Sequence, residues 1–267
     1  MEEKKENQNS SSKKSAKRAI LTIAGLVMLI AGVVYLGYYF YGQYTANIED
    51  EKYTEASTAS PSQSQEQYAE NPIDFDEWQK KNDEIYAWIK VDGTEVDYPI
   101  VQSGTDDDFY LRHSAADKSW VASGAIFTQS HNTKTFNDSV TVIYGHNGYS
   151  ESMFTSLHKF EKKDFFDEHP YFYIYMPQRK LTYQVVSAFK YDDRHIMNSF
   201  DFQDSNVLVD FQKMIQDPSS SLKNVREDLD TEINSESKLV VLSTCITGQK
   251  SSRYLVCGVL VNDEKTN

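Results

Sequence analysis

The stretch from Lys238 to Val261, KLVVLSTCITGQKSSRYLVCGVLV, contains two apolar runs separated by a short polar loop. Apolar runs of this kind that are bounded by turn residues are typical of β-strands, and the short loop predicts an antiparallel hairpin. Cys245 lies where the first run ends, and Arg253 lies where the second begins. The hairpin would therefore bring a thiol and a guanidinium to the same edge of a sheet.

Further short apolar runs predict that the fold is mainly β. We expect strands at residues 96–102, 125–128, 140–144, 171–176 and 181–191. An aromatic content of 13% suits half-buried pleated surfaces. Short strands separated by frequent turns indicate an all-β barrel or sandwich with helices added.

Two segments predict these added helices. Phe75, Trp78, Ile85 and Trp88 recur at helical spacing, after Asp74 as a candidate N-cap. Residues 205–216 place their apolar side chains on one helical face, between the late strands.

The chain has only two cysteines, Cys245 and Cys257, so a disulfide framework is excluded. In the predicted hairpin their Cα atoms would lie about 13 Å apart along the strands. Disulfides need Cα atoms within about 7 Å. We therefore expect two free thiols, with Cys257 as a small core residue.

The N-terminal region predicts a membrane anchor. Residues 1–19 are polar and basic, and residues 20–42 carry no charged side chain, which is long enough for one membrane-spanning helix. Basic residues before the span predict a cytoplasmic N-terminus and an extracellular remainder. Residues 43–71 read as a flexible extracellular linker and residues 72–267 as a folded domain. A cleaved signal peptide is the alternative to an uncleaved signal anchor.

Charge and spacing exclude several other classes. The formal net charge of −13 argues against a nucleic-acid partner. No two histidines stand at helical i, i+4 spacing and no CxxC pair is present, so no metal or cofactor is predicted. The Asp run at 106–108 lacks the spacing of an EF-hand and predicts a solvated turn.

A reactive cysteine needs a proton-transfer partner, for which histidine is the usual residue. His146 closes the strand VTVIYGH and precedes Asn147-Gly148, so its side chain would project from a strand end. The other histidines lie in polar or amphipathic segments. For any single histidine, His146 included, a structural or surface role is the default. A papain-type arrangement is not expected, because its cysteine precedes its histidine in the chain.

An N-terminal anchor, a linker, a β-rich domain, His146 in YGHN and LSTC followed by Arg253 together resemble a sortase, the Gram-positive cell-surface cysteine transpeptidase. The form LSTC, a helical segment before the first strand and the 205–216 helix resemble class B in particular. The resemblance covers residues 72–262. It implies an eight-stranded sortase-type β-barrel with N-terminal helices and an added helix between late strands.

The resemblance also implies roles for the site residues. Cys245 would attack a backbone carbonyl and form a thioester, His146 would protonate the leaving amine, and Arg253 would hold the substrate carbonyl or the oxyanion. Ser243 and Thr244 flank the nucleophile, and strand alternation predicts that one of them faces the groove. Both are candidate substrate contacts, and for Ser243 a plain strand position is equally expected. Several class B members have Asp directly after the cysteine, whereas this chain has Ile246, so no carboxylate that orients His146 can be named.

The implied function is cleavage of a C-terminal sorting signal on secreted proteins and transfer of the acyl group to a peptidoglycan amine or its lipid-linked precursor. A pilin polymerase that uses a lysine amine is the first alternative. The Asp-Pro-aromatic lid motif common in pilus-type class C enzymes is not found in this sequence, which favours wall anchoring. A non-enzymatic surface module with Cys245 as a buried thiol is the second alternative.

Overall fold

The computed structural model describes residues 2–54, 68–148 and 151–267. The chain divides into two compact units, residues 1–44 and 45–267. The long helix α1 (Glu2–Thr54) crosses the boundary between them. The two units are described separately below.

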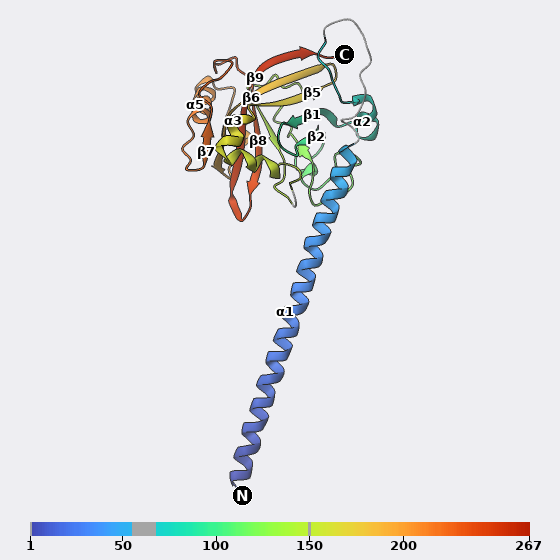
Figure 1. The fold of residues 1–267 in the computed structure, drawn as a ribbon, viewed down its shortest axis with the longest axis vertical. Coiled ribbons are helices and arrows are strands. Elements are labelled where there is room, and N and C mark those ends of the chain that lie inside the picture. Colours follow the sequence, from blue (N-terminus) through green and yellow to red (C-terminus); the bar gives the residue numbers. More distant parts are fainter. Residues whose placement is uncertain (1, 55–67, 149–150) are drawn as a thin grey trace. The chain divides into compact units, whose positions relative to one another are not determined.

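Eight strands of the second unit close into a barrel, as the sequence predicted (Figure 1). They follow the order β5-β1-β2-β3-β4-β8-β9-β6, and pairing of β5 with β6 closes the ring. Pairings β2–β3 and β4–β8 are parallel, and the other pairings in the ring are antiparallel. The strands are β1 (Ile85–Val91), β2 (Asp97–Val101), β3 (Ile126–Phe127), β4 (Val140–Tyr144), β5 (Tyr171–Met176), β6 (Arg179–Asp192), β8 (Leu239–Ile246) and β9 (Gln249–Lys265). A ninth strand, β7 (Lys223–Val225), pairs with β6 outside the ring.

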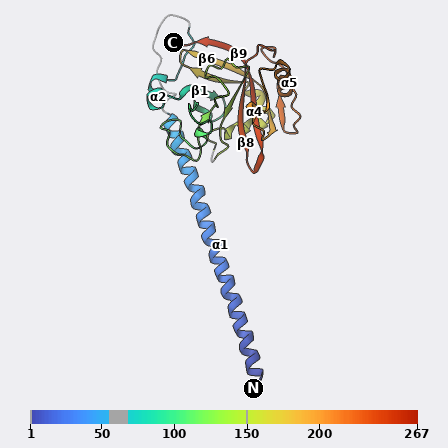
Figure 2. The same ribbon diagram turned by 180° about the vertical axis from the view of Figure 1, so that it is seen from behind.

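Apolar side chains fill two regions of the barrel domain. The larger region is built around fully buried aromatic residues such as Trp88, Phe172 and Tyr183. The helix α5 (Ser205–Gln216) lies beside the barrel strands (Figure 2). In the second region, its Phe211 and Ile215 are buried together with strand residues. The helix predicted at 205–216 is therefore confirmed.

Short helical elements connect the strands. Before β1 lies α2 (Phe75–Lys81), and between β4 and β5 lie the 3-10 helix η3 (Thr155–Glu161) and α3 (Lys163–Glu168). The 3-10 helix η2 (Phe109–Leu111) precedes β3, and α4 (Ile196–Ser199) follows β6.

The predicted helical stripe from Phe75 to Trp88 is only half right. Asp74 accepts a hydrogen bond from the Glu77 amide as the N-cap, but α2 ends at Lys81. Asn82 is extended, and its buried side chain donates to the Tyr110 hydroxyl and the Ala115 carbonyl. These tertiary hydrogen bonds redirect the chain into β1.

Residues 45–54 differ from the flexible linker predicted for residues 43–71. They are helical, and Ala46, Glu49 and Tyr53 are buried in the barrel unit. The Tyr98 hydroxyl donates to Asp50 over 2.8 Å, which ties this helical end to β2. The sequence did not predict this helix, because charged residues obscure the helical spacing of the few residues that are buried. Residues 55–67 lie outside the described residues.

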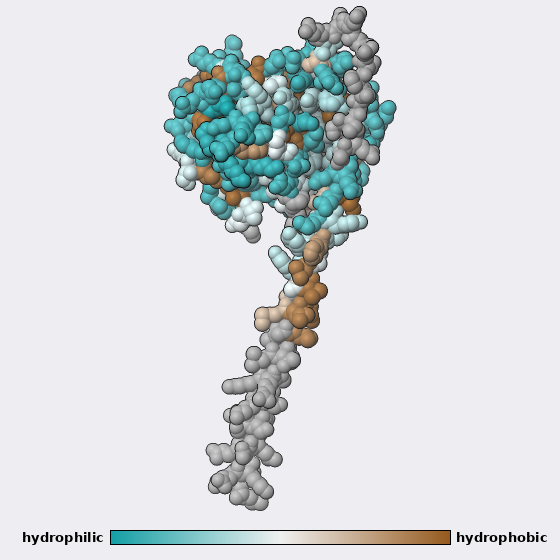
Figure 3. All heavy atoms as spheres, viewed as in Figure 1, coloured by the Kyte–Doolittle hydropathy of each residue, from teal (hydrophilic) through white to brown (hydrophobic). Residues whose placement is uncertain are grey.

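In the described part of the chain, one N-terminal helix is long and apolar enough to cross a membrane, over Leu26–Tyr53. A signal sequence would pass the same test of length and composition. Figure 3 shows hydrophobic side chains gathered along α1, whereas the visible face of the barrel unit is mostly hydrophilic. The exposed apolar residues on the helix include Leu26, Val27, Met28, Leu29, Ile30, Val33, Val34 and Leu36.

Candidate active site

The β8–β9 hairpin places Cys245 directly opposite Arg253, as the sequence predicted. The preceding residues of β8 are buried, whereas Cys245 is exposed at the point where the regular ladder ends. The register shifts after this pair, so that Ile246 pairs with Gln249. Gly248 lies at φ +75°, in the left-handed region that a tight turn favours.

His146 reaches this hairpin because β4 runs parallel to β8. Tyr144 pairs with Ser243, and the Gly145 amide donates to the Ser243 carbonyl over 3.2 Å. A Cβ atom at Gly145 would lie 2.6 Å from side-chain atoms of Ile126 and Phe154. Only glycine fits there, and it brings His146 beside the end of β8.

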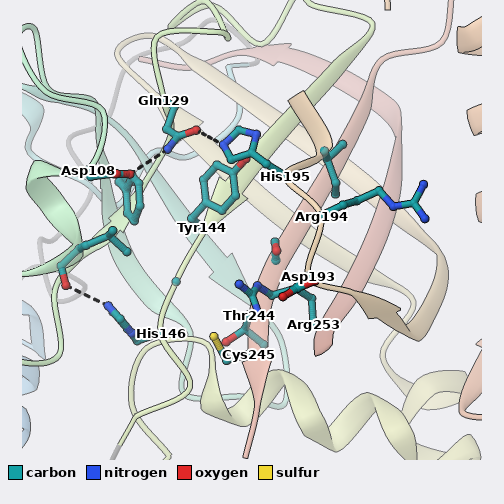
Figure 4. A pocket seen from close by; sticks show the side chains of 15 residues that line it. Asp108, Gln129, Tyr144, His146, Asp193, Arg194, His195, Thr244, Cys245 and Arg253 are labelled. Carbon is teal, nitrogen blue, oxygen red and sulfur yellow. Dashed lines mark hydrogen bonds between the residues drawn. The ribbon is translucent and has the colours of Figure 1, made fainter. Parts of the chain in front are cut away.

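His146, Cys245 and Arg253 line one pocket, together with Ser243 and Thr244 (Figure 4). All five residues named from the sequence are thus brought together. Figure 4 shows Cys245 between His146 and Arg253. The rest of the lining is Asp108, Leu111, Phe127, Gln129, Tyr144, Gly145, Asp193, Arg194, His195 and Ile196.

The imidazole of His146 is held by a backbone carbonyl. Its Nε2 lies 2.9 Å from the Leu111 oxygen, and a carbonyl only accepts, so Nε2 carries a hydrogen. Burial lowers the pKa of His146, the Leu111 hydrogen bond opposes this, and the charge of Arg112 lowers it further. The structure therefore favours a neutral imidazole whose Nε2 faces Leu111.

The two cysteines differ in their capacity to form a thiolate. Cys257 is fully buried in β9, and burial raises the pKa of its thiol to about 12. Cys245 is exposed at the pocket. Burial therefore argues against Cys257 as a reactive thiol, and Cys245 is the cysteine that a molecule in the pocket can reach. Both cysteines are free, as predicted.

Two buried hydroxyl groups at the pocket have unused hydrogen-bonding capacity. Within the described residues, Thr244 Oγ1 and the Tyr144 hydroxyl are buried without a hydrogen-bond partner. Such groups are costly to bury unless something pairs with them.

The sequence did not indicate several of the pocket residues. His195 Nε2 lies 2.6 Å from Gln129 Oε1, and Gln129 Nε2 donates to Asp108 over 3.1 Å. These residues come from three connections far apart in the chain, so only the barrel closure brings them together. Asp107 accepts hydrogen bonds from the Ser130 amide and hydroxyl, which accounts for part of the acidic run. No group of three metal-binding side chains occurs among the described residues.

Comparison with known proteins identifies the family. Residues 89–261 match the family model of the sortase domain. The chain belongs to the sortase family. Sortase B of Listeria monocytogenes is 31% identical over 191 residues, covering 68% of this chain and 72% of that protein.

Solved structures agree with this assignment. The sortase B from B. anthracis in complex with AAEK1 superposes with a TM-score of 0.68 at 26% identity, covering 84% of this chain and 99% of that one. A Streptococcus pyogenes class B sortase involved in pilus biogenesis is 32% identical with a TM-score of 0.59, covering 71% and 98% respectively. This sortase is therefore a sortase B family cysteine transpeptidase.

Proposed function

We propose that this sortase is anchored in the cell membrane by residues 20–42, with its N-terminus in the cytoplasm and its barrel outside. It cleaves a C-terminal sorting signal on secreted proteins through a thioester at Cys245. It then transfers the acyl group to a peptidoglycan amine or its lipid-linked precursor. The observation that carries this proposal is the convergence of His146, Cys245 and Arg253 on one pocket.

The chemistry follows from these three side chains. The Cys245 thiolate attacks the substrate carbonyl carbon, and Arg253 with nearby backbone amides stabilises the developing oxyanion. His146 takes up the proton that leaves the Cys245 thiol, gives it to the leaving amine and later removes one from the incoming amine. Burial makes the His146 imidazolium a stronger acid, which suits proton donation. His146 must exchange its Leu111 hydrogen bond for substrate during the reaction.

Ser243 and Thr244 are the proposed substrate contacts next to the nucleophile. Both line the pocket, and Thr244 has the buried hydroxyl without a partner in the described part of the chain. A peptide amide that pairs with Thr244 Oγ1 would remove the cost of that buried group. Thr244 is therefore the better supported of the two contacts.

Pilin polymerisation remains the second candidate function. It is favoured by the relative from Streptococcus pyogenes that is involved in pilus biogenesis. The two candidates differ only in the acceptor, which is a wall peptide amine in one and a lysine side chain of a pilin in the other. A non-enzymatic module is disfavoured because the chain is a family transpeptidase.

Competition between acceptor amines tests the choice. The full chain in detergent micelles is incubated with a library of sorting-signal peptides, and triglycine, a stem peptide and a lysine-containing pilin-type peptide are offered together. Wall anchoring predicts ligation to triglycine or the stem peptide. Ligation to the lysine peptide alone would replace this function with pilin polymerisation, and the Cys245→Ala chain is the control.

A further inference from the structure

The backbone carbonyl of Cys245 is approached by two side chains from a different part of the fold. Asn147 Nδ2 donates to it over 2.9 Å, and His158 Nε2 lies 3.1 Å from it. Asn147 directly follows His146, and His158 lies on η3. The end of β8, the residues that follow β4 and the helix η3 therefore come together at the backbone carbonyl of the proposed nucleophile.

His158 is itself held from two sides. Its Nδ1 lies 2.6 Å from Glu161 Oε1, and its ring stacks on Tyr254 with centroids 4.9 Å apart. Tyr254 pairs with Thr244 across the hairpin. The imidazole is therefore oriented by a carboxylate on its own helix and by an aromatic ring on β9.

The hydrogens on the Asn147 side chain determine which of its contacts are donated hydrogen bonds. The Asn147 amide has two hydrogens, and its Nδ2 is within 2.9 Å of the Cys245 oxygen and 3.0 Å of Thr247 Oγ1. His158 Nε2 lies 3.1 Å from the same oxygen, within hydrogen-bonding distance. Glu161 Oε1 lies 2.6 Å from Nδ1, so the ring is held between a carboxylate and the Cys245 carbonyl.

We propose that His158 and Glu161 are positioning residues that fix the Cys245 backbone, and with it the sulfur, relative to His146. The proposal rests on the proposed function, since it assumes Cys245 as the nucleophile. The need for such support is visible in the hairpin, because the regular ladder stops at Cys245. A strand end that is not held by hydrogen bonds is mobile, and a small displacement of a reacting atom lowers the rate of the reaction.

The same contacts also link the two proposed catalytic segments. The His146 carbonyl accepts from the Phe154 amide over 3.0 Å at the entrance to η3. Asn147 and His158 lie 3.2 Å apart at Nδ2 and Nε2. Among the described residues, neither His158 nor Glu161 lines the pocket, so their loss should not weaken peptide binding.

A matched set of variants in the full chain tests this role. His158→Phe keeps a ring on Tyr254 but removes both ring nitrogens, whereas His158→Gln offers an amide N–H to the Cys245 carbonyl. Glu161→Gln removes the charge behind the ring. His169→Phe is the control, because His169 stacks on Phe165 at 4.0 Å and bonds only a local carbonyl in the described structure. Steady-state kinetics use the peptide selected from the library above, with thermal melting in parallel.

We expect His158→Phe to lower kcat about tenfold with KM for the peptide unchanged, since the transition state alone needs the exact placement. His158→Gln should recover most of kcat, Glu161→Gln should be intermediate, and His169→Phe should behave as wild type. Equal kcat in His158→Phe and wild type, no recovery by Gln, or a loss that follows the melting temperature would overturn the proposal. A Cys245→Ala chain that still turns over would instead refute the proposed function.

Discussion

Single residues account for the way the site is assembled. The hairpin register, a local feature, predicted Cys245 opposite Arg253, whereas His146 was selected through the resemblance to sortases. The structure places all three at one pocket. The sequence could not indicate how His146 is held, because Leu111 belongs to a distant connection. It also missed His158, whose role depends on η3 meeting the hairpin.

Gly145 offers a residue-scale test of how His146 is placed. A Cβ atom there would meet Ile126 and Phe154 at 2.6 Å, so Gly145→Ala should destabilise the domain by about 1–3 kcal/mol. It should also lower kcat/KM, because the next residue is His146. Gly148→Ala is the matched control, since the nearest atom to its Cβ, Ser152 Oγ, is 4.0 Å away. Urea unfolding and peptide kinetics measure both effects, and equal behaviour of the two variants would contradict the steric explanation.

His146 also predicts a pH dependence of stability. Burial lowers its pKa in the folded state, so the unfolded chain binds the proton more readily. Above the pKa of about 6.5 that a histidine has in the unfolded chain, His146 is neutral in both states and does not change the free energy of unfolding. As the pH falls from about 6.5 towards the lower pKa of the folded state, the unfolded chain takes up the proton first and the free energy of unfolding decreases. His195, whose pKa is also lowered mainly by burial, acts in the same direction.

Urea unfolding from pH 8 to pH 5 checks this sign. Replacing His146 by Gln should make the decrease in the free energy of unfolding between pH 8 and pH 5 smaller. Adding His195→Gln to that variant should make the decrease smaller still. Asp50, whose pKa is raised to about 6 mainly by burial, acts in the opposite direction over this range, so the comparison of variants carries the test. A His146→Gln chain with an unchanged slope would show that burial does not control this histidine.

At the scale of elements, the sequence predicted the helices and strands that have strong apolar patterns. It did not predict the element boundaries that depend on tertiary contacts. The hairpin, the helix at 205–216 and most of the barrel strands follow from their apolar patterns, whereas the sequence wrongly predicted a helix at the start of β1. The end of α2 does not follow from such a pattern, because the buried Asn82 side chain replaces helix hydrogen bonds with tertiary ones. The polar helical end at 45–54 was missed because only a few of its residues, such as Ala46 and Tyr53, are buried.

The contact of residues 45–54 with the barrel can be measured by hydrogen exchange. The Tyr53 ring lies 5.7 Å from Trp78 and 5.7 Å from Tyr98, centroid to centroid, and is buried. Tyr53→Ala should therefore speed amide exchange in 45–54 while leaving the β8–β9 amides unchanged. Tyr44→Ala, at an exposed position of the same helix, is the control. Unchanged exchange in Tyr53→Ala would mean that this ring does not hold the segment.

At the scale of the whole molecule, the two units divide the proposed function between anchoring and chemistry. Among the described residues, the helix carries most of the exposed large apolar side chains, and the barrel carries the pocket. The proposed membrane insertion rests on the apolar length of the span, and the proposed orientation rests on the basic residues before it. The two thiols make this orientation measurable, because Cys245 is exposed and Cys257 is buried.

A membrane-impermeant thiol reagent applied to intact cells should label the wild-type chain once. The Cys245→Ala chain should remain unlabelled under the same conditions. Labelling of wild type only after the cells are opened would place the barrel in the cytoplasm and reverse the proposed orientation.

Detection of the thioester on Cys245 tests the central claim most directly. The full chain is incubated with the selected sorting-signal peptide without an amine acceptor, and its mass is measured intact and after digestion. We predict an added mass equal to the N-terminal part of the peptide, located on Cys245, removed by hydroxylamine and absent from Cys245→Ala. An adduct on Cys257, or one that persists in Cys245→Ala, would contradict Cys245 as the nucleophile.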